Sequence, residues 1–103
     1  MKNYCIYILT NRRRGVLYIG VTGNIQRRLI EHRLEKIEGF TKQYFLKKLV
    51  YVESYQYIND ALKREKQLKA WLRAWKLDLI EQQNPEWLDL FELFWGKQET
   101  LLL

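Results

Sequence analysis

The chain has 103 residues, 48% of them hydrophobic and only one proline, so we expect one globular domain over residues 1–103 and exclude a disordered tail. Its formal net charge of +6 at pH 7 would attract phosphate polyanions, although charge alone leaves membrane surfaces and acidic partners open. With one cysteine, no secretion signal and no apolar run near the roughly 20 residues that cross a bilayer, we expect a cytoplasmic protein without a disulfide or a membrane partner.

Two β-rich runs open the chain. Residues 4–10 and 16–21 are dense in β-branched and aromatic types, with a short polar segment between them. This pattern predicts a β-hairpin. From Asn24 to Glu35 apolar residues recur at helical spacing, and Thr22 or Asn24 is available to cap the first turn, which predicts the first helix.

A third strand and two helices are predicted next. Residues 49–55 form another β-rich run. Asn59 or Asp60 is a good N-cap for a long helix with one broad apolar face, and we expect a bend near residues 70–74 before a further helix over residues 73–82.

The last helix is expected to start at Asn84 and Pro85, because asparagine is a common N-cap and proline suits the first helical position. The predicted fold is therefore of the α+β class, a small three-stranded, mainly antiparallel sheet flanked by helices. Its order is β-β-α-β-α-α with a further short C-terminal helix.

Several short motifs occur in a fixed order along the chain. Cys5-Ile6-Tyr7 lies in the first predicted strand and Tyr18-Ile19-Gly20 at the end of the second, and Arg28 and His32 follow on the first helix. This set resembles the GIY-YIG nucleases. The resemblance continues in order to the end of the predicted helices, through Gly39-Phe40-Thr41, Leu49-Val50-Tyr51, the segment from Arg64 to Lys69, and Asn84-Pro85. It is nearest to the small stand-alone bacterial members.

The resemblance implies a metal-dependent endonuclease that hydrolyses phosphodiester bonds in DNA, with RNA left open as a substrate and with repair or recombination as its setting. In the family a glutamate holds a divalent cation, Mg²⁺ or Mn²⁺, and the matching residue is Glu65. Leu62 and Leu68 lie three residues to either side of it, so the carboxylate sits on or beside the apolar face of its helix. The alternative to a metal role is a surface ion pair with Lys69 at i+4.

The other family residues carry the remaining tasks of hydrolysis. Arg28 matches the arginine that stabilises the transition state, and Tyr7 and Tyr18 match the paired tyrosines that position or activate water. His32 lies one helical turn beyond Arg28 and so projects from the same face, where a direct role and an inert one are equally weighted. In a regular hairpin the two tyrosines share a sheet face only if paired residue numbers sum to an odd value.

Two features leave alternatives open. Cys5 replaces the usual first glycine of the motif on the same side of the strand as Tyr7, where it could crowd the site. Gly20 permits either a close approach of backbone or a bulge. A binding module without turnover and a protein-interaction subunit therefore remain alternative functions.

Candidate contacts to nucleic acid outside the motifs are Lys42 and Lys47, which could replace a basic residue that some relatives carry after the second motif. Arg27 is a further candidate, although Glu31 at i+4 can pair with it. Asn84 is a weak candidate, because capping explains it without a ligand.

The C-terminal segment places apolar residues around nearly every side of its predicted helix. One core does not cover them all, so we expect a homodimer or a protein partner to bind there. The residues concerned are Trp87, Leu88, Leu90, Phe91, Leu93, Phe94 and Trp95.

Overall fold

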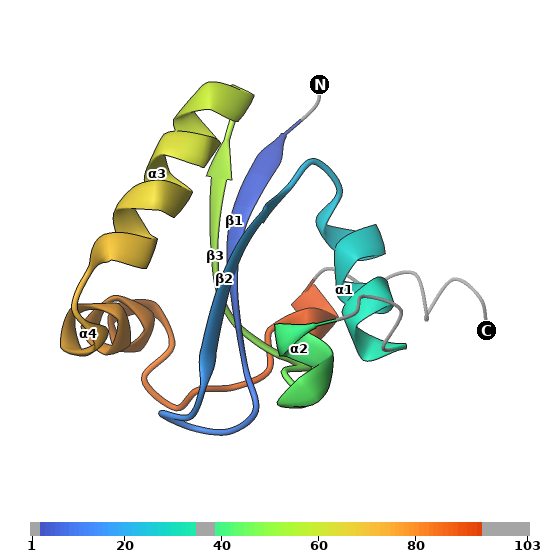
Figure 1. The fold of residues 1–103 in the computed structure, drawn as a ribbon, viewed down its shortest axis with the longest axis vertical. Coiled ribbons are helices and arrows are strands. Elements are labelled where there is room, and N and C mark those ends of the chain that lie inside the picture. The colour runs from blue at the N-terminus through green and yellow to red at the C-terminus, as the bar shows by residue number, and fades with distance from the viewer. Residues whose placement is uncertain (1–2, 35–38, 94–103) are drawn as a thin grey trace.

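The structure of this chain is a computed structural model, which describes residues 3–34 and 39–93 (Figure 1). In chain order its elements are β1 (Tyr4–Thr10), β2 (Leu17–Thr22), α1 (Ile25–Arg33), α2 (Phe40–Gln43), β3 (Lys48–Tyr55), α3 (Ile58–Ala70) and α4 (Arg73–Gln83). Residues 91–93 are again helical. The predicted α+β class and the order of its elements are confirmed, while the one-turn helix α2 has no counterpart among the predictions.

The three strands form an antiparallel sheet in the order β2-β1-β3. Across the hairpin Tyr7 pairs with Gly20 and Leu9 pairs with Tyr18, so paired numbers sum to an odd value. Tyr7 and Tyr18 therefore share one face of the sheet. An irregularity between Ile8 and Leu9 affects only the pairing with β3.

The two faces of the sheet carry separate hydrophobic clusters. On one face α3 packs over the strands, and the buried residues there include Ile6, Ile8, Ala61 and Leu68. On the other face α1 packs over the strands. The buried residues there are Tyr7, Leu9, Leu29, Leu46 and Leu49. Figure 1 shows the sheet between α3 and α4 on one side and α1 and α2 on the other. Among the described helices none is both long and apolar enough to cross a membrane.

Local chemistry explains where the helices begin and end. Asn24 caps α1, because its side chain accepts a hydrogen bond of 3.0 Å from the backbone N–H of Arg27. Of the two predicted caps it is Asn24 that binds the helix, while Thr22 Oγ1 accepts from Asn24 N at 3.1 Å. The predicted cap of α3 is wrong: the helix begins at Ile58, and Asp60 lies in its first turn, where its charge suits the helix dipole.

Asn84 ends a helix instead of starting one. It is the C-cap of α4, and the residues up to 90 are turns and irregular structure, so the predicted start of the last helix at Pro85 is wrong. The Asn84 side chain is buried and donates to the carbonyls of Val50 at 3.2 Å and Leu88 at 2.9 Å, while its oxygen accepts from Leu88 N at 2.9 Å. It thereby ties β3 to the segment after α4.

The C-terminal apolar residues divide between the core and the surface. Trp87 lies in the irregular segment with a φ of 56° and is fully buried, and its indole N–H donates to Glu81 at 2.7 Å. The prediction that it belongs to the last helix is therefore wrong, and its side chain packs in the hydrophobic core. Leu88 and Leu93 are exposed. Leu90 and Phe91 are partly buried against the cluster that contains Tyr7 and Leu9. Phe94 and Trp95 lie outside the described residues.

Replacing Asn84 with alanine tests the tie between β3 and the segment after α4. Because Asn84→Ala removes three hydrogen bonds and leaves a buried carbonyl of Val50 without its donor, we expect unfolding to become easier by about 2 kcal/mol. Urea unfolding followed by tryptophan fluorescence measures this. The exposed Asn59→Ala on α3 is the control, and equal midpoints for the two variants would contradict the assignment.

Candidate active site

Tyr7 lies directly over Gly20, the glycine of the second motif. A Cβ built on Gly20 would lie 2.5 Å from Tyr7 Oη and 2.8 Å from its Cε1, distances that no side chain tolerates. The glycine therefore leaves the space that the phenol ring fills. Of the two roles open from the sequence, close approach is the one observed, because the pairing of β1 and β2 runs through Gly20 without a bulge.

Three aromatic side chains from β1, β2 and α1 meet at this point. Tyr7 Oη and His32 Nε2 are 3.2 Å apart and buried. The ring of Tyr18 lies 6.2 Å from that of Tyr7 and 5.7 Å from that of His32, measured between centroids. The register of the hairpin and the burial of His32 on the inner side of α1 thus bring together three residues of the predicted site.

The protonation of this cluster follows from its burial. Burial raises the pKa of Tyr7 above its usual value, the neighbouring Tyr18 raises it further, and the positive charge of Arg28 acts in the opposite direction. Burial lowers the pKa of His32 to about 4, with a further contribution from Arg28, although Glu31 opposes the change. At neutral pH the phenol therefore keeps its proton and the imidazole is neutral. In the His32 tautomer that carries its proton on Nδ1, the Tyr7 O–H donates and His32 Nε2 accepts.

Arg28 stands at the edge of the cluster and lines a surface hollow of about 450 Å³. Its Nε lies 3.5 Å from a carboxylate oxygen of Glu31, and Nε of Arg27 lies 3.6 Å from the other. The pairing of Arg27 with Glu31 was predicted, and that of Arg28 was not. Both pairs are long and partly exposed, which is the geometry of weak surface ion pairs. The remaining residues around the hollow are Thr22, Gly23 and Asn24.

Glu65 is not in contact with this cluster. It lies on α3, which covers the other face of the sheet, and its carboxylate is 3.5 Å from Lys69 Nζ. The ion pair weighed as the alternative to a metal role is thus present. Among the described residues no group of three or more His, Cys, Asp or Glu side chains is placed to hold a metal ion. A metal at Glu65 would therefore be held by fewer than three such side chains of the described residues.

The position of Glu65 along α3 still turns it toward the hairpin. Successive helical residues are about 100° apart, so Arg64 and Glu65 flank the line through the buried Ala61 and Leu68 on opposite sides. Arg64 reaches toward β3, at one edge of the sheet, where it pairs with Glu53. Glu65 is consequently turned toward the other edge, which is β2, the strand that carries Tyr18 on its opposite face.

The other predicted residues take varied places. Lys42 is exposed on α2, and Lys47 is half-buried just before β3. Asn84 is committed to the hydrogen bonds described above. Cys5 is buried on the same sheet face as Tyr7, with its Sγ 3.9 Å from Ser54 Oγ. Since Ser54 belongs to β3, the thiol is directed to the strand opposite Tyr18, away from the aromatic cluster.

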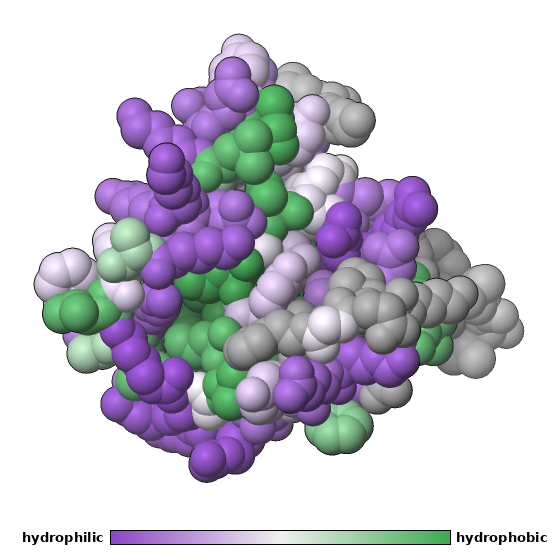
Figure 2. Space-filling model, viewed as in Figure 1, coloured by the Kyte–Doolittle hydropathy of each residue, from purple (hydrophilic) through white to green (hydrophobic). Residues whose placement is uncertain are grey.

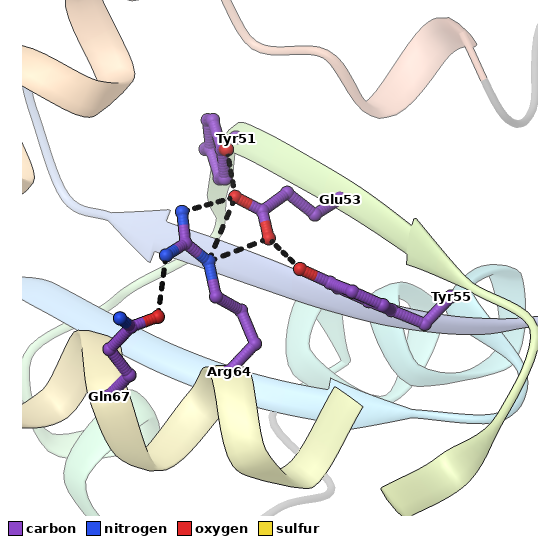
Figure 3. A network of polar contacts seen from close by, with 5 residues as sticks. All are labelled: Tyr51, Glu53, Tyr55, Arg64 and Gln67. Carbon is purple, nitrogen blue, oxygen red and sulfur yellow. Dashed lines mark hydrogen bonds and ion pairs between the residues drawn. The ribbon is translucent and has the colours of Figure 1, made fainter. Parts of the chain in front are cut away.

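A polar network that was not predicted joins β3 to α3 (Figure 3). Glu53 accepts hydrogen bonds from Tyr51, Tyr55 and Arg64. A signal for it exists in the sequence: Tyr51, Glu53 and Tyr55 alternate along a strand, so the carboxylate shares a face with two aromatic rings and needs a partner. The partner itself lies on a later element and leaves no local sign.

Comparison with known proteins places the chain in a family. The family model described as the GIY-YIG catalytic domain matches residues 3–78. The chain therefore belongs to the GIY-YIG family, a family of nucleases.

Relatives of similar size are found in bacteria. A "UPF0213 protein" of Syntrophus aciditrophicus is 45% identical over 86 residues, which cover 82% of this chain and 95% of that protein. UPF0213 protein SERP0126 of Staphylococcus epidermidis is 34% identical over 82 residues, covering 80% and 99%. The solved structure of UPF0213 protein BH0048 from Bacillus halodurans aligns with a TM-score of 0.55 at 24% identity, covering 88% of this chain and 96% of that chain, and so supports the fold.

The contact between Tyr7 and Gly20 is open to a double-mutant test. Gly20→Ala forces a methyl group against the phenol ring, so we expect a loss of about 2 kcal/mol in the free energy of unfolding. In a Tyr7→Leu background the outer ring atoms are gone and the same substitution should cost less than about 0.5 kcal/mol. Chemical denaturation of the four proteins measures both steps. Equal costs in the two backgrounds would rule out the contact.

The burial of neutral His32 predicts how stability depends on pH. The pKa of His32 is about 4 in the folded chain and about 6.5 when unfolded, so the unfolded state takes up the proton first as pH falls. Stability should therefore fall by about 2 kcal/mol between pH 7 and pH 5 on account of this residue. Urea unfolding at the two pH values, compared with His32→Gln, isolates the effect. A wild-type pH dependence no steeper than that of the variant would show that His32 titrates normally.

Proposed function

We propose that the chain is a metal-dependent endonuclease that cleaves DNA, with its site built on the aromatic cluster of Tyr7, Tyr18 and His32 beside Arg28. The observation that carries the proposal is the buried contact between Tyr7 Oη and His32 Nε2 in a chain of a nuclease family. A buried phenol bonded to a neutral imidazole is a chemically useful pair, and packing alone does not require it.

The pair provides a route for the proton that leaves the attacking water. Since burial raises the pKa of Tyr7, its phenol is not a phenolate at neutral pH and cannot act alone as the base. Neutral His32 can accept the Tyr7 proton through Nε2 while the phenol oxygen accepts one from water. Tyr18, on the neighbouring strand with its ring beside both, would orient that water.

Arg28 would bind the phosphate oxygens on which charge develops. Its guanidinium is always charged and can donate two parallel hydrogen bonds to a phosphate. The ion pair with Glu31 is long and partly exposed, so the exchange of carboxylate for phosphate costs little. The negative charge of the phosphate replaces that of Glu31 in this role.

The Glu65 carboxylate would be the ligand of the Mg²⁺ or Mn²⁺ ion. Mg²⁺ is commonly bound by one or two carboxylates together with waters and substrate phosphate oxygens, and it needs no cluster of protein ligands. The Glu65 carboxylate is half-buried, and its ion pair with the exposed Lys69 is 3.5 Å long, so replacing Lys69 with a cation would cost little. The cation would neutralise charge on the phosphate when bound. Glu65 would meet the substrate around the edge strand β2.

DNA would lie across the hairpin and α1 in this proposal. The formal charge of +6 favours a polyanion, and Arg27, Lys42 and Lys47 stand on the side of α1 and α2 as contacts to the phosphate backbone. Figure 2 shows hydrophilic side chains along the outer side of α3 and around the rim of this face, with hydrophobic residues between them. The whole chain would act as one domain in the cytoplasm.

Nicking of supercoiled plasmid DNA tests the proposal. With Mg²⁺ present, wild-type protein should relax the plasmid, and Arg28→Ala and Glu65→Ala should each slow it at least about a hundredfold, because each removes a group that acts on the transition state. Binding to a duplex should change little, since one contact is a small part of the affinity.

Two variants serve as matched controls for the nicking experiment. Arg13→Ala removes an exposed arginine that pairs with Glu86, and Asp60→Ala removes a carboxylate from α3 itself. Both should nick DNA at the wild-type rate. Unchanged nicking by Glu65→Ala would overturn the metal role, and tight binding without any nicking by the wild type would favour a binding module.

A further inference from the structure

The polar network between β3 and α3 is denser than a surface ion pair (Figure 3). The Glu53 carboxylate accepts from Arg64 Nε and Nη2, each at 3.0 Å, and from Tyr55 Oη at 2.7 Å. Tyr51 donates to it as well. The third guanidinium nitrogen of Arg64, Nη1, donates to Gln67 on the next turn of α3 at 2.7 Å. Every nitrogen of the guanidinium therefore has a partner.

The network holds its geometry because it is half-buried and fully bonded. The side chains of Arg64 and Glu53 are 22% and 16% exposed. Burial by itself would raise the pKa of Glu53, but the donors from Arg64, Tyr51 and Tyr55 outweigh it and keep that pKa below its usual value. The Arg64 guanidinium also lies over the ring of Trp71, 5.2 Å from its centroid. The planar guanidinium of Arg64, with a partner on every nitrogen, is held in one orientation.

The apolar contacts of α3 do not fix its rotation in the same way. Over its 13 residues the buried positions are Ala61 and Leu68, a narrow line two turns long with one small side chain. Such a line holds the helix against the sheet but resists rolling about the helix axis only weakly. Arg64 lies to one side of this line, and its partner Glu53 belongs to strand β3. The pair therefore fixes the rotation of α3 about its own axis.

The roll of α3 decides where Glu65 points. Arg64 and Glu65 flank the buried line on opposite sides, one toward β3 and the other toward β2. A carboxylate lies roughly 6 Å from the helix axis, so a roll of about 15° would move it by about 1.5 Å. Displacements of that size are enough to spoil a metal site or a catalytic contact.

We propose that Glu53 and Arg64 are positioning residues, which orient Glu65 toward the β2 edge by fixing the roll of α3. This inference rests on the proposed function, which makes Glu65 the ligand of the metal. It adds that β3 takes part in the site from the far edge of the sheet, through a helix and without touching substrate.

Charge and position predict opposite results for one variant. Arg64→Gln removes a positive charge near Glu65, which by electrostatics alone would strengthen the binding of a cation. If Arg64 instead orients Glu65, the same variant weakens binding, and we expect about tenfold, the low end of the range for residues that support a metal ligand. Arg64→Lys keeps the charge and loses the fork, so it should also bind more weakly than wild type and serves if Arg64→Gln does not fold.

Mn²⁺ titration of ¹⁵N-labelled protein measures the site without cleavage, because the bound ion broadens nearby amide signals. Wild type should lose the signals around Glu65 first, Glu65→Gln should not, and Arg64→Gln should need about tenfold more Mn²⁺. Arg14→Gln, which breaks the 2.8 Å pair with Glu81 elsewhere, is the matched control and should titrate like wild type. Circular dichroism confirms that each variant is folded.

The outcomes separate this inference from the function on which it rests. Equal or tighter Mn²⁺ binding by folded Arg64→Gln and Arg64→Lys, with the effect of Glu65→Gln intact, would overturn the positioning role alone. Broadening that is unchanged in Glu65→Gln, or that never centres on Glu65 in wild type, would overturn the metal role and the inference together.

Discussion

The ring of Tyr7 rests on the bare backbone of Gly20, and the geometry of the candidate site follows from this contact. It requires glycine at the position paired with Tyr7, and it requires β1 and β2 to keep the register in which Tyr7 and Tyr18 share a face. A slip of one residue would turn one tyrosine to the other side of the sheet. With the ring packed against the Gly20 backbone, the Tyr7 hydroxyl lies 3.2 Å from His32 Nε2, which links the hairpin to α1.

The residues that match the family motifs lie on both faces of the sheet. The aromatic cluster and Arg28 lie on the face covered by α1, whereas Glu65 belongs to the helix on the opposite face. Tyr18 lies on β2, one of the two edge strands, and the position of Glu65 on α3 turns it toward the same edge. An edge is accessible to a long polyanion in a way that a closed pocket is not. This arrangement suits a substrate that passes across the hairpin. The position of Glu65 relative to the aromatic cluster then depends on how α3 packs on the sheet.

Structure that depends on a few neighbouring residues was predicted correctly from the sequence. Two β-rich runs predicted the hairpin, and the alternation of side chains along a strand predicted the parity rule. Helical spacing predicted α1 and the break before α4, and one of the two candidate caps, Asn24, is the observed one. Contacts between distant elements had no local sign. Asn84 followed by Pro85 suits a helix start, yet the amide is drawn to carbonyls of Val50 and Leu88, and the helix ends there. In the same way, Arg64 finds its partner 11 residues earlier on a different element.

The central claim is that Glu65 and the Tyr7 cluster act on one phosphodiester around the β2 edge. A crystal structure of the chain with a DNA duplex and Ca²⁺, which binds oxygen ligands and slows hydrolysis, tests it most directly. The claim predicts a Ca²⁺ ion about 2.3 to 2.6 Å from a Glu65 oxygen, bound also to a phosphate that Arg28 contacts. An ion held elsewhere, with Glu65 still paired to Lys69 and the DNA on another face, would contradict it.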